Sequence, residues 1–364
     1  MEKQIILAKI TEMITDMVQI EDNGECLFFT EDNRQISDKA WSDWNWSQGV
    51  ALYGLYKYAK ATGDQNAYQE VQAWFANYAG QDIKEKQVNA MAPILTLAHL
   101  YEELGDPDML QQIKIWGEWA MKELPKTNFG GFQHTVFVAE NPGQLWDDTL
   151  MMAALTMAKI GTLLDRQDYI DEAQRQFLVH TQFLMDKKTG LWFHGWTFEE
   201  KHNFGEALWG RGNCWITIAI PELFEILGDN ISGAVRLFLQ DVLRYQIDSL
   251  ITHQSQDGLW HTLINDKNSY VEISSTLGFG YGILKACHMG LIEKDFLAYG
   301  KKAIEGSLPY IHQGRVSNVS AGTGMGSDLD FYRRIPLDDM PYGPALAILA
   351  LNEYLPESAP VTVG

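Results

Sequence analysis

Hydrophobic residues along this chain gather in helix-length segments that are apolar on nearly every face. Six such segments follow one another, at 46–64, 88–106, 146–165, 212–229, 274–290 and 342–355. Each mixes Gly, Ala, Ser and Thr with large apolar side chains, the composition of a helix buried among other helices. The pattern therefore predicts six buried helices spread over the whole chain.

Most of these segments end in Gly or Gly-Asp and are followed by a helix with a one-sided hydrophobic pattern, such as 66–80 or 169–186. We expect six helical hairpins, with an inner ring of buried helices inside an outer ring of amphipathic ones. This is an all-α fold of the (α/α)6-barrel type. Because no Pro-rich or Gly/Ser-rich linker interrupts the chain, residues 1–364 are predicted to form one catalytic domain.

A second repeat lies in the loops that lead from outer helices to inner ones. Residues 130–134 (GGFQH), 190–196 (GLWFHGW) and 258–261 (GLWH) each place Gly, an aromatic residue and His shortly before a buried segment. Alternating runs in the last two predict small strand hairpins. Since all outer-to-inner connections lie at the same end of such a barrel, we expect these histidines to meet at one rim.

The charge and the cysteines narrow the class of partner and the location. The chain has 28 basic and 48 acidic residues, a net charge of −20, and no Lys/Arg cluster, so nucleic acid and anionic membranes are unfavourable partners. Three widely spaced cysteines indicate neither a disulfide framework nor a thiolate zinc site. The first 18 residues read as an amphipathic helix rather than a signal peptide. No segment has the length of a membrane span, and a cytoplasmic location is expected.

Tryptophan is concentrated at the expected rim. The residues are Trp44, Trp46, Trp146, Trp192, Trp196, Trp209, Trp215 and Trp260. Flat aromatic faces pack against the apolar faces of sugar rings. The same bulky side chains also fill helical cores, so each residue alone permits either role. Taken together, the concentration favours a sugar-binding site.

Two consecutive carboxylates, Asp147 and Asp148, open the third buried segment. Asp148 shares a helical face with Met151, Met152 and Leu155, whereas Asp147 is expected about 100° away around the helix. A carboxyl group desolvated by Trp and Met has a raised pKa and can serve as a general acid. Asp148 is therefore the candidate acid, with capping of the helix N-terminus as the alternative.

The segment 194–215 is rich in hydrogen-bond donors and glycine. Arg211, between Gly210 and Gly212, is suited to bind a substrate carboxylate bidentately, with an ion pair to an acid such as Glu206 as the alternative. No His spacing typical of a metal site occurs. The run 322–326 (GTGMG) lacks the Lys and the spacing of a phosphate loop. We therefore expect neither a metal nor another cofactor.

These motifs, in this order, resemble the family 105 glycoside hydrolases, the unsaturated rhamnogalacturonyl hydrolases, and more distantly the family 88 unsaturated glucuronyl hydrolases. The motifs are GGFQH, LWDDTLMM, GLWFHGW, ALWGRGNCW and YGPALAILA, and the resemblance extends from residue 43 to the last helix. It implies an (α/α)6 barrel that removes a 4,5-unsaturated uronic acid from the non-reducing end of lyase-generated oligosaccharides. In that reaction an acid protonates C4 and water adds at C5.

The resemblance also implies roles for individual residues. It assigns the acid/base role to Asp148 and contacts with the unsaturated sugar and its carboxylate to His134, His194, Trp209 and Arg211. With Asn89 and the tryptophans at 44, 46 and 146, these residues form the expected site.

Two positions depart from the family pattern. Asn89 stands where many relatives carry a second Asp, and an amide cannot take a proton although it can hydrogen-bond a hydroxyl group. Thr135 replaces a basic residue of some relatives. The substrate preference is expected to differ accordingly.

Two other functions stay open from the sequence. An enzyme similar to N-acylglucosamine 2-epimerase uses paired histidines on such a barrel, and His194, His261 and His312 keep this reading open. A non-catalytic sugar-binding protein would keep the tryptophans and lose the acid, so Asp148 beside Trp146 weighs against it. Neither the sugar that follows the uronate nor the oligomeric state can be inferred from the sequence.

Overall fold

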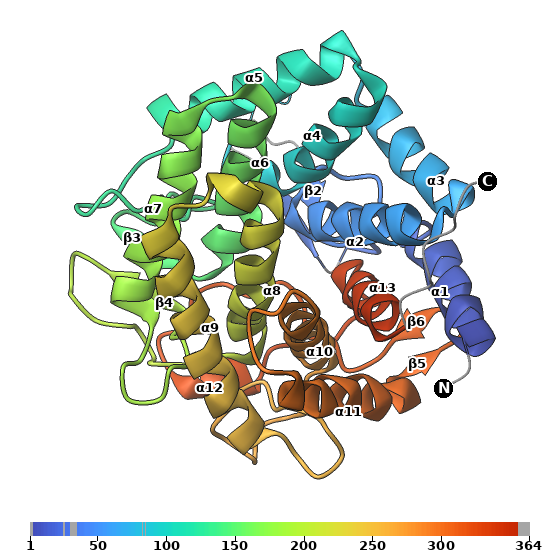
Figure 1. Cartoon of the computed structure of the whole chain (residues 1–364), viewed down its shortest axis with the longest axis vertical. Helices are drawn as coiled ribbons and strands as arrows, with labels where there is room; N and C mark the ends of the chain where they lie inside the picture. Colours follow the sequence, from blue (N-terminus) through green and yellow to red (C-terminus); the bar gives the residue numbers. More distant parts are fainter. Residues whose placement is uncertain (1–2, 25, 30–34, 82, 84, 356–364) are drawn as a thin grey trace.

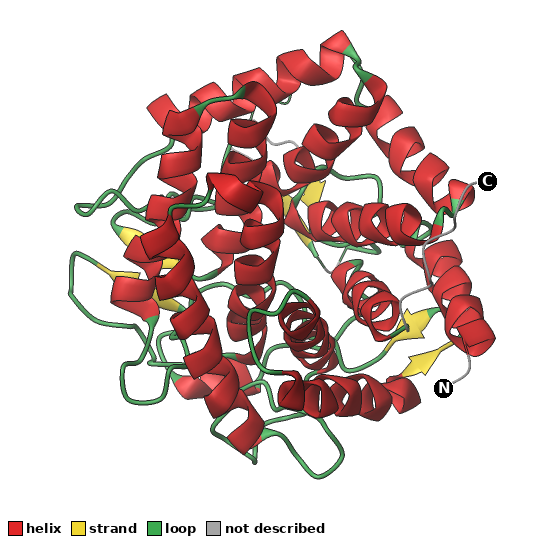
Figure 2. Ribbon diagram, viewed as in Figure 1, coloured by secondary structure: helices red, strands yellow, loops and turns green. Residues whose placement is uncertain are grey.

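The computed structural model describes residues 3–24, 26–29, 35–81, 83 and 85–355, and this part of the chain is mostly helical (Figure 2). Six helices correspond to the buried segments: α2 (Trp46–Thr62), α4 (Ala92–Leu104), α6 (Leu155–Leu164), α8 (Gly210–Leu227), α10 (Ile273–His288) and α13 (Tyr342–Tyr354). Nearly every residue of α8 and α10 is buried. The prediction of an all-α fold is confirmed.

The buried helices contact one another in a closed ring (Figure 1). Helix α2 packs against α4, α4 against α6, α6 against α8, α8 against α10, α10 against α13, and α13 back against α2. Glycine permits the closest approaches. A Cβ at Gly49 would lie 2.5 Å from that of Ala92, and one at Gly282 would lie 2.4 Å from the carbonyl oxygen of Thr217. A larger residue at either position would push neighbouring helices apart.

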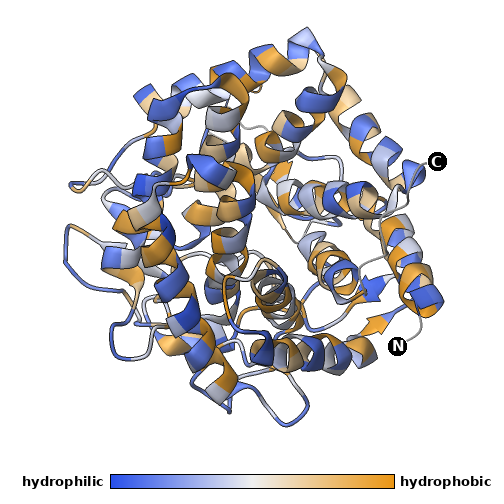
Figure 3. Ribbon diagram, in the orientation of Figure 1, coloured by the Kyte–Doolittle hydropathy of each residue, from blue (hydrophilic) through white to orange (hydrophobic). Residues whose placement is uncertain are grey.

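A second layer of helices surrounds the ring. It contains α3 (Gln65–Ala76), α5 (Pro107–Lys122), α7 (Gln167–Leu184), α9 (Gly233–His253) and α11 (Leu297–Ser307), each in contact with the inner helix that precedes it. On α5 the buried residues Ile113, Trp116, Gly117 and Ala120 have the spacing of a single helical face. Hydrophilic and hydrophobic residues accordingly alternate along α5 and α9 in Figure 3.

The last inner helix is covered from the other end of the chain. Helix α1 (Lys3–Met17) contacts α13 and buries Ile6, Ile10, Met13 and Met17. The expectation of six consecutive hairpins is therefore wrong for the sixth pair. Within the described residues no helix follows α13, and the amphipathic N-terminal helix covers it instead.

Short strands form three antiparallel pairs in the described part of the chain. Strand β1 (Leu27–Phe29) pairs with β2 (Gln35–Ser37), β3 (Gln144–Trp146) with β4 (Gly195–Thr197), and β5 (Ile311–His312) with β6 (Arg315–Val316). The β3–β4 pair is not the local hairpin expected from residues 190–196, because it joins two rim loops from different repeats. The loop at 258–261 forms only an isolated bridge between His261 and Val271.

The described helices include none with the length and apolar character that crossing a membrane requires. Cys26, Cys214 and Cys287 are all free thiols.

Candidate active site

A cavity of about 170 Å³ lies at the end of the ring where the inner helices begin. Its walls contain most of the residues expected to bind substrate, namely Trp46, Asn89, His134, Trp146, Asp148, Trp209 and Arg211. Phe28, Asp38, Asn45 and the loops 136–138 and 322–324 complete the lining. Of the three loops whose histidines were expected to meet at the rim, 130–134 lines the cavity through His134, 190–196 reaches Asp148 through His194, and 258–261 does not line it.

Helix N-termini converge on this cavity. Trp46 is the first residue of α2, Asn89 opens the 3-10 turn (Asn89–Met91) that leads into α4, and Arg211 lies in the first turn of α8. A helix N-terminus presents unpaired backbone N–H groups and a partial positive charge. This end of the ring therefore favours an anionic ligand in spite of the negative net charge of the chain.

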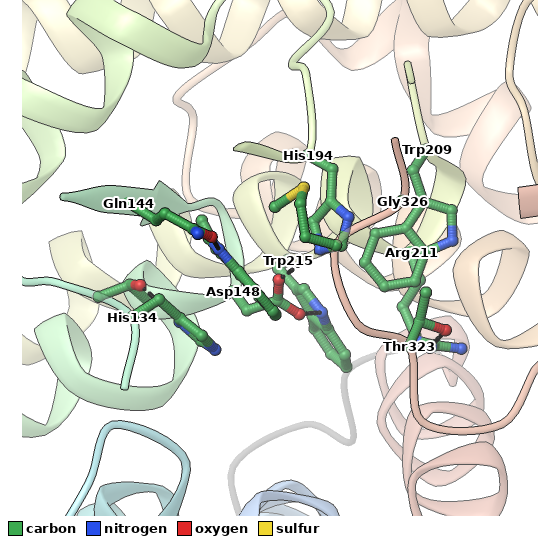
Figure 4. Close-up of polar contacts among 12 residues, drawn as sticks. His134, Gln144, Asp148, His194, Trp209, Arg211, Trp215, Thr323 and Gly326 are labelled. Atoms are coloured by element: carbon green, nitrogen blue, oxygen red, sulfur yellow. Dashed lines mark hydrogen bonds and ion pairs between the residues drawn. The ribbon is translucent and has the colours of Figure 1, made fainter. Parts of the chain in front are cut away.

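Asp148 is oriented by hydrogen bonds to both of its oxygens. Oδ1 accepts from Nε1 of Trp215 at 3.1 Å, and Oδ2 lies 3.1 Å from Nε2 of His194. Figure 4 shows Asp148 between His134 on one side and Trp209 and Arg211 on the other. The carboxylate is thus held in one orientation and still reaches the cavity.

Behind Asp148, His194 is held by Tyr332 of helix α12 (Leu329–Arg333). The Tyr332 hydroxyl lies 2.8 Å from Nδ1 of His194 and accepts a hydrogen bond from the N–H of Gly326 at 3.1 Å. When this hydroxyl donates to Nδ1, Nε2 carries the ring proton of neutral His194 and donates it to Asp148. A chain of hydrogen bonds therefore fixes the orientation of the candidate acid.

Asp147 is fully buried beside Asp148 and, unlike Asp148, is not part of the cavity wall. Asp147 lies in the turn between β3 and the helix, where the 100° spacing of a regular helix does not apply. Space for its carboxyl group exists because residue 212 is Gly, since a Cβ there would lie 2.2 Å from Oδ2 of Asp147. Neither of its carboxyl oxygens has a hydrogen-bond partner among the described residues, and one of them lies within 4.8 Å of an oxygen of Asp148.

The two carboxyl groups have opposite pKa shifts. Burial and the charge of Asp148 raise the pKa of Asp147 well above its usual value. Burial also acts to raise the pKa of Asp148, but the hydrogen bond and electrostatic effect of His194, and then of the nearby His134, hold it below its usual value. The prediction of a raised pKa at Asp148 is therefore wrong, because His194 outweighs the effect of burial. The neighbouring carboxyls titrate as a pair that keeps one proton, mainly on Asp147.

The helix that follows Asp148 starts with a π-helical turn, Leu150–Ala154, before α6 begins. Such wide turns are rare in proteins, and those that occur are often found at functional sites. The sequence Leu-Met-Met-Ala-Ala contains no signal for it, because its apolar residues fit a regular buried helix equally well.

His134 and Trp146 form one aromatic wall of the cavity. Their rings stack with centroids 4.4 Å apart and an interplanar angle of 10°. Nδ1 of His134 lies 2.8 Å from the hydroxyl of Thr149, and Nε2 has no partner among the described residues. Burial lowers the pKa of His134 to about 3, so this ring is uncharged at neutral pH. It can hydrogen-bond a ligand through Nε2.

Arg211 is 1% exposed and supports the loop 320–323. Nη1 donates to the carbonyl oxygen and hydroxyl of Ser320, and Nη2 donates to Ala321 O and Thr323 Oγ1 at 2.8 and 2.7 Å. Its partners therefore lie in this loop rather than at Glu206. Because both terminal nitrogens are engaged, the bidentate grip expected for Arg211 would require the loop to rearrange.

Trp44 lies outside this cavity. Its Nε1 donates to Ala90 O at 2.9 Å, and its ring packs against Trp74, Phe75 and Tyr78 beside a separate groove between α3 and α5. Its placement gives it a packing role beside the site.

Of the three histidines that kept the epimerase reading open, His194 alone reaches the cavity region. Nδ1 of His261 faces the carbonyl oxygen of Ser269, and His312 is exposed on β5.

One cluster among the described residues has side chains close enough to hold a metal ion. It consists of Asp147, Asp148 and His194, whose potential ligand atoms lie within 4.8 Å of one another. No residue spacing in the chain predicts this cluster, since the carboxylates and His194 come from different loops. The donor set does not fit a metal ion well, because Asp148 accepts from Trp215 and the Nε2 of His194 faces the carboxylate. The arrangement fits proton exchange.

Asp38 and Tyr332 lie at the site but are not among the residues predicted from the sequence. Neither belongs to a repeat or a motif. Both are single polar residues in loops that reach the cavity only through the tertiary path of the chain. Tyr332 follows the glycine-rich run 322–326, which was the nearest available signal.

The cavity combines a carboxyl pair, aromatic walls and helix N-termini, an arrangement typical of enzymes that act on carbohydrates. Comparison with known proteins identifies the class of enzyme. The chain belongs to Glycosyl Hydrolase Family 88, whose family model matches residues 23–357. The resemblance to families 105 and 88 is thereby confirmed, and the protein is a glycosidase.

Its relatives include solved structures and curated enzymes. A possible member of family 105 from Salmonella enterica is 48% identical and covers 97% of this chain and 94% of its own, with a TM-score of 0.95. A similar protein from Klebsiella pneumoniae is 47% identical and covers 97% and 93%, with a TM-score of 0.94. The unsaturated rhamnogalacturonyl hydrolase YesR of Bacillus subtilis is 29% identical over 86% of this chain and 90% of its own length.

Proposed function

We propose that this enzyme removes a 4,5-unsaturated uronic acid from the non-reducing end of lyase-generated oligosaccharides, with rhamnogalacturonan-type fragments as the preferred class. The name of the Bacillus relative supports this substrate class. The observation that carries the proposal is the position of Asp148, oriented by His194 and Trp215 and facing the cavity at which helix N-termini converge. Such a site combines a proton donor with an environment that attracts a carboxylate.

The reaction begins with transfer of a proton to C4 of the C4=C5 double bond, which leaves a cation shared by C5 and the ring oxygen. Water then adds to C5 and gives up a proton to the carboxylate. The resulting hemiketal opens by cleavage of the bond between C5 and the ring oxygen. The hemiacetal left at C1 collapses and releases the rest of the oligosaccharide as an alcohol. One water is consumed, and the proton taken from the acid is returned.

Asp148 is the group that exchanges protons with the substrate. It lines the cavity, whereas Asp147 does not. Its low pKa means that in the resting enzyme the proton of the pair resides on Asp147. Asp147 gives this proton to the neighbouring carboxylate of Asp148, which then protonates C4; the proton that water releases restores the pair. Asp147 is thus the proton store of the pair.

The carboxylate of the substrate is bound by the positive end of the cavity. Arg211 supplies the charge, and the loop 322–324 that it holds supplies backbone N–H groups. Asn89, His134 and Trp209 contact the sugar ring, with Trp46 and Trp146 as its aromatic walls. No step in this scheme needs a metal or another cofactor.

We further propose that the closed ring of helices is an (α/α)6 barrel and that the whole chain is one catalytic domain. The contacts of each inner helix with two neighbours support this architecture. The free thiols of all three cysteines are consistent with the cytoplasmic location inferred from the sequence.

The test is incubation with an unsaturated disaccharide produced by a rhamnogalacturonan lyase. Hydration removes the near-ultraviolet absorbance of the conjugated double bond, and a keto sugar and rhamnose-ended product form in equal amounts. A sugar epimerase or a non-catalytic binding protein would leave the absorbance unchanged. An unchanged absorbance with folded protein would overturn the proposal.

A further inference from the structure

Asp38, directly after β2, brings another carboxyl group to the cavity wall. It is 8% exposed and lines the same cavity as Asp148. Its Oδ1 accepts hydrogen bonds from Nδ2 of Asn45 at 2.5 Å and from Nε1 of Trp46 at 3.1 Å. These two donors hold the carboxyl group in place through one oxygen.

The other oxygen of Asp38 has no hydrogen-bond donor among the described residues. Oδ2 faces the glycine-rich loop, where a Cβ at Gly322 would lie 2.5 Å away. A side chain at position 322 would therefore cover this oxygen. With Gly there, Oδ2 is left for a ligand in the cavity.

Charge in the cavity determines which form of Asp38 can accept an anionic ligand. Among the described lining residues the acidic side chains are Asp38 and Asp148, and Arg211 is the cation. If both acids are ionised, the wall is net negative before a uronate adds its own charge. Binding an anion therefore favours the neutral form of Asp38, which is also a hydrogen-bond donor.

The surroundings of Asp38 contain several other titratable groups. They are Asp22, Cys26 and Lys39 from the N-terminal segment, Arg211 from α8, Asp338 from the loop before α13, and Tyr342 from α13. Cys26, with a pKa raised to about 12 by burial, and Tyr342, with a pKa raised by burial, keep their protons at neutral pH. Lys39 is paired with Asp338 at 2.7 Å.

The pKa of Asp38 itself lies near neutral pH. Burial raises the pKa of Asp38 to about 7, against the opposing effects of the Trp46 hydrogen bond and of Arg211.

We propose that Asp38 is a substrate-binding residue that accepts a proton when the uronide binds and donates it, from Oδ2, in a hydrogen bond to an oxygen of the bound sugar. This inference rests on the proposed function. It makes affinity for a uronide decrease as the pH rises through neutrality, whereas affinity for an uncharged sugar is much less affected.

The experiment measures proton uptake during binding. Asp148→Asn serves as the background, because it prevents turnover and removes the titration of Asp148. Calorimetric titration with the unsaturated disaccharide at pH 7, in phosphate and in Tris, gives the number of protons taken up from the difference in binding enthalpy. The same titration is made with Asp148→Asn/Asp38→Asn and, as a matched control, with Asp148→Asn/Asp339→Asn, whose second change lies outside the cavity.

We expect uptake of a fraction of one proton, about one half, by the background and the control, and none by the variant lacking Asp38. Between pH 6 and 8 the Kd of the background should rise several-fold and that of Asp148→Asn/Asp38→Asn should stay constant. Equal proton uptake with and without Asp38 would overturn this inference alone, as would binding without any uptake. Failure of folded Asp148→Asn to bind the disaccharide would overturn the proposed function, and this inference with it.

Discussion

The ring of inner helices contains charged groups at both ends, and the surroundings of these groups differ between the two ends. At the cavity end, Asp38 and Asp148 each have contacts that orient the carboxyl group while part of it faces open space. At the far end, Glu222 of α8 lies about 16 Å further along the helix than Arg211, at 1.5 Å per residue. Glu222 is not among the residues that line the cavity.

The far-end cluster consists of Tyr53, Lys57, Glu222, Tyr281 and Lys285. Glu222 is fully buried, and its oxygens face Nζ of Lys57 at 3.3 Å and Nζ of Lys285 at 3.0 Å. The hydroxyl groups of Tyr53 and Tyr281 donate to the same carboxylate. Burial acts to raise the pKa of Glu222, but the two lysines hold it below its usual value.

The difference between the two ends separates structural charge from chemical charge. A buried ion contributes to stability when its hydrogen-bonding capacity is filled, as for Glu222. A group that binds or protonates a ligand must keep capacity free, which lowers the stability of the empty site. Changes at the far end should therefore affect folding, and changes at the cavity end should affect turnover.

The largest effect is expected for Asp148→Asn. The amide keeps the size of the side chain and can still accept from Trp215, but it cannot transfer a proton. Turnover of the unsaturated disaccharide should fall by at least roughly 10²–10⁴-fold, with little change in thermal unfolding. A variant that stays active would exclude Asp148 as the acid.

Asp147→Asn distinguishes the proton store from a passive neighbour. Regular helix geometry predicts that this change leaves most of the rate intact, whereas the buried pair predicts a loss of about ten- to a hundredfold. Because the raised pKa of Asp147 keeps the pair protonated, the wild-type rate should decline as the pH rises through that pKa, and the variant should lack this decline. A pH–rate profile of both proteins measures it, and identical profiles would remove Asp147 from the mechanism.

Glu222→Gln should give the opposite result. Loss of this carboxylate leaves Lys57 and Lys285 near each other, with Glu225 as their remaining acidic partner among the described residues. Breaking a buried pair costs about 3 kcal/mol. Urea unfolding should show that decrease, while kcat of the folded protein is unchanged. Glu118→Gln is the control, because Glu118 forms an exposed ion pair with Lys122 on α5. This change should lower the stability much less. A normal unfolding midpoint for Glu222→Gln would contradict the structural role of the far-end cluster.

A smaller effect is expected for Tyr332→Phe. Loss of the hydroxyl leaves Nδ1 of His194 without this partner, so the ring and Asp148 are held less firmly. Removal of one such hydrogen bond should lower kcat about tenfold and leave KM nearly constant. The acidic limb of the pH–rate profile should also shift, which a purely structural role would not cause. An equal change in kcat and KM with an unshifted profile would assign Tyr332 to packing.

The smallest effect is expected for a chelator. The ligand atoms of Asp147, Asp148 and His194 are close together, but Asp148 already lies at hydrogen-bond distance from His194 and accepts from Trp215. Dialysis against EDTA should therefore leave turnover unchanged. A loss of activity that a divalent ion restores would show that the cluster holds a metal.

The repeat pattern predicted the helices of the ring well, because burial on every face leaves a strong signature in composition. Aromatic and histidine motifs likewise predicted His134, Asp148 and Arg211 at one cavity. The pKa values and partners of these residues could not be predicted. They depend on which loop meets which, as when β3 pairs with β4 and brings His194 to Asp148. For Asp38 the sequence offers no signal, since its role depends on Gly322 and Asn45 across the cavity.

The pairing of α1 with α13 affects how the chain is made as well as how it is held. Helix α1 is synthesised before every other described helix, and its partner α13 is synthesised last. At about 5–20 residues per second, the apolar face of α1 waits on the order of tens of seconds for that partner. During this interval Ile6, Ile10, Met13 and Met17 are exposed to misassociation. Completion of the ring is therefore a late step in biogenesis, at which chaperones have the longest opportunity to act.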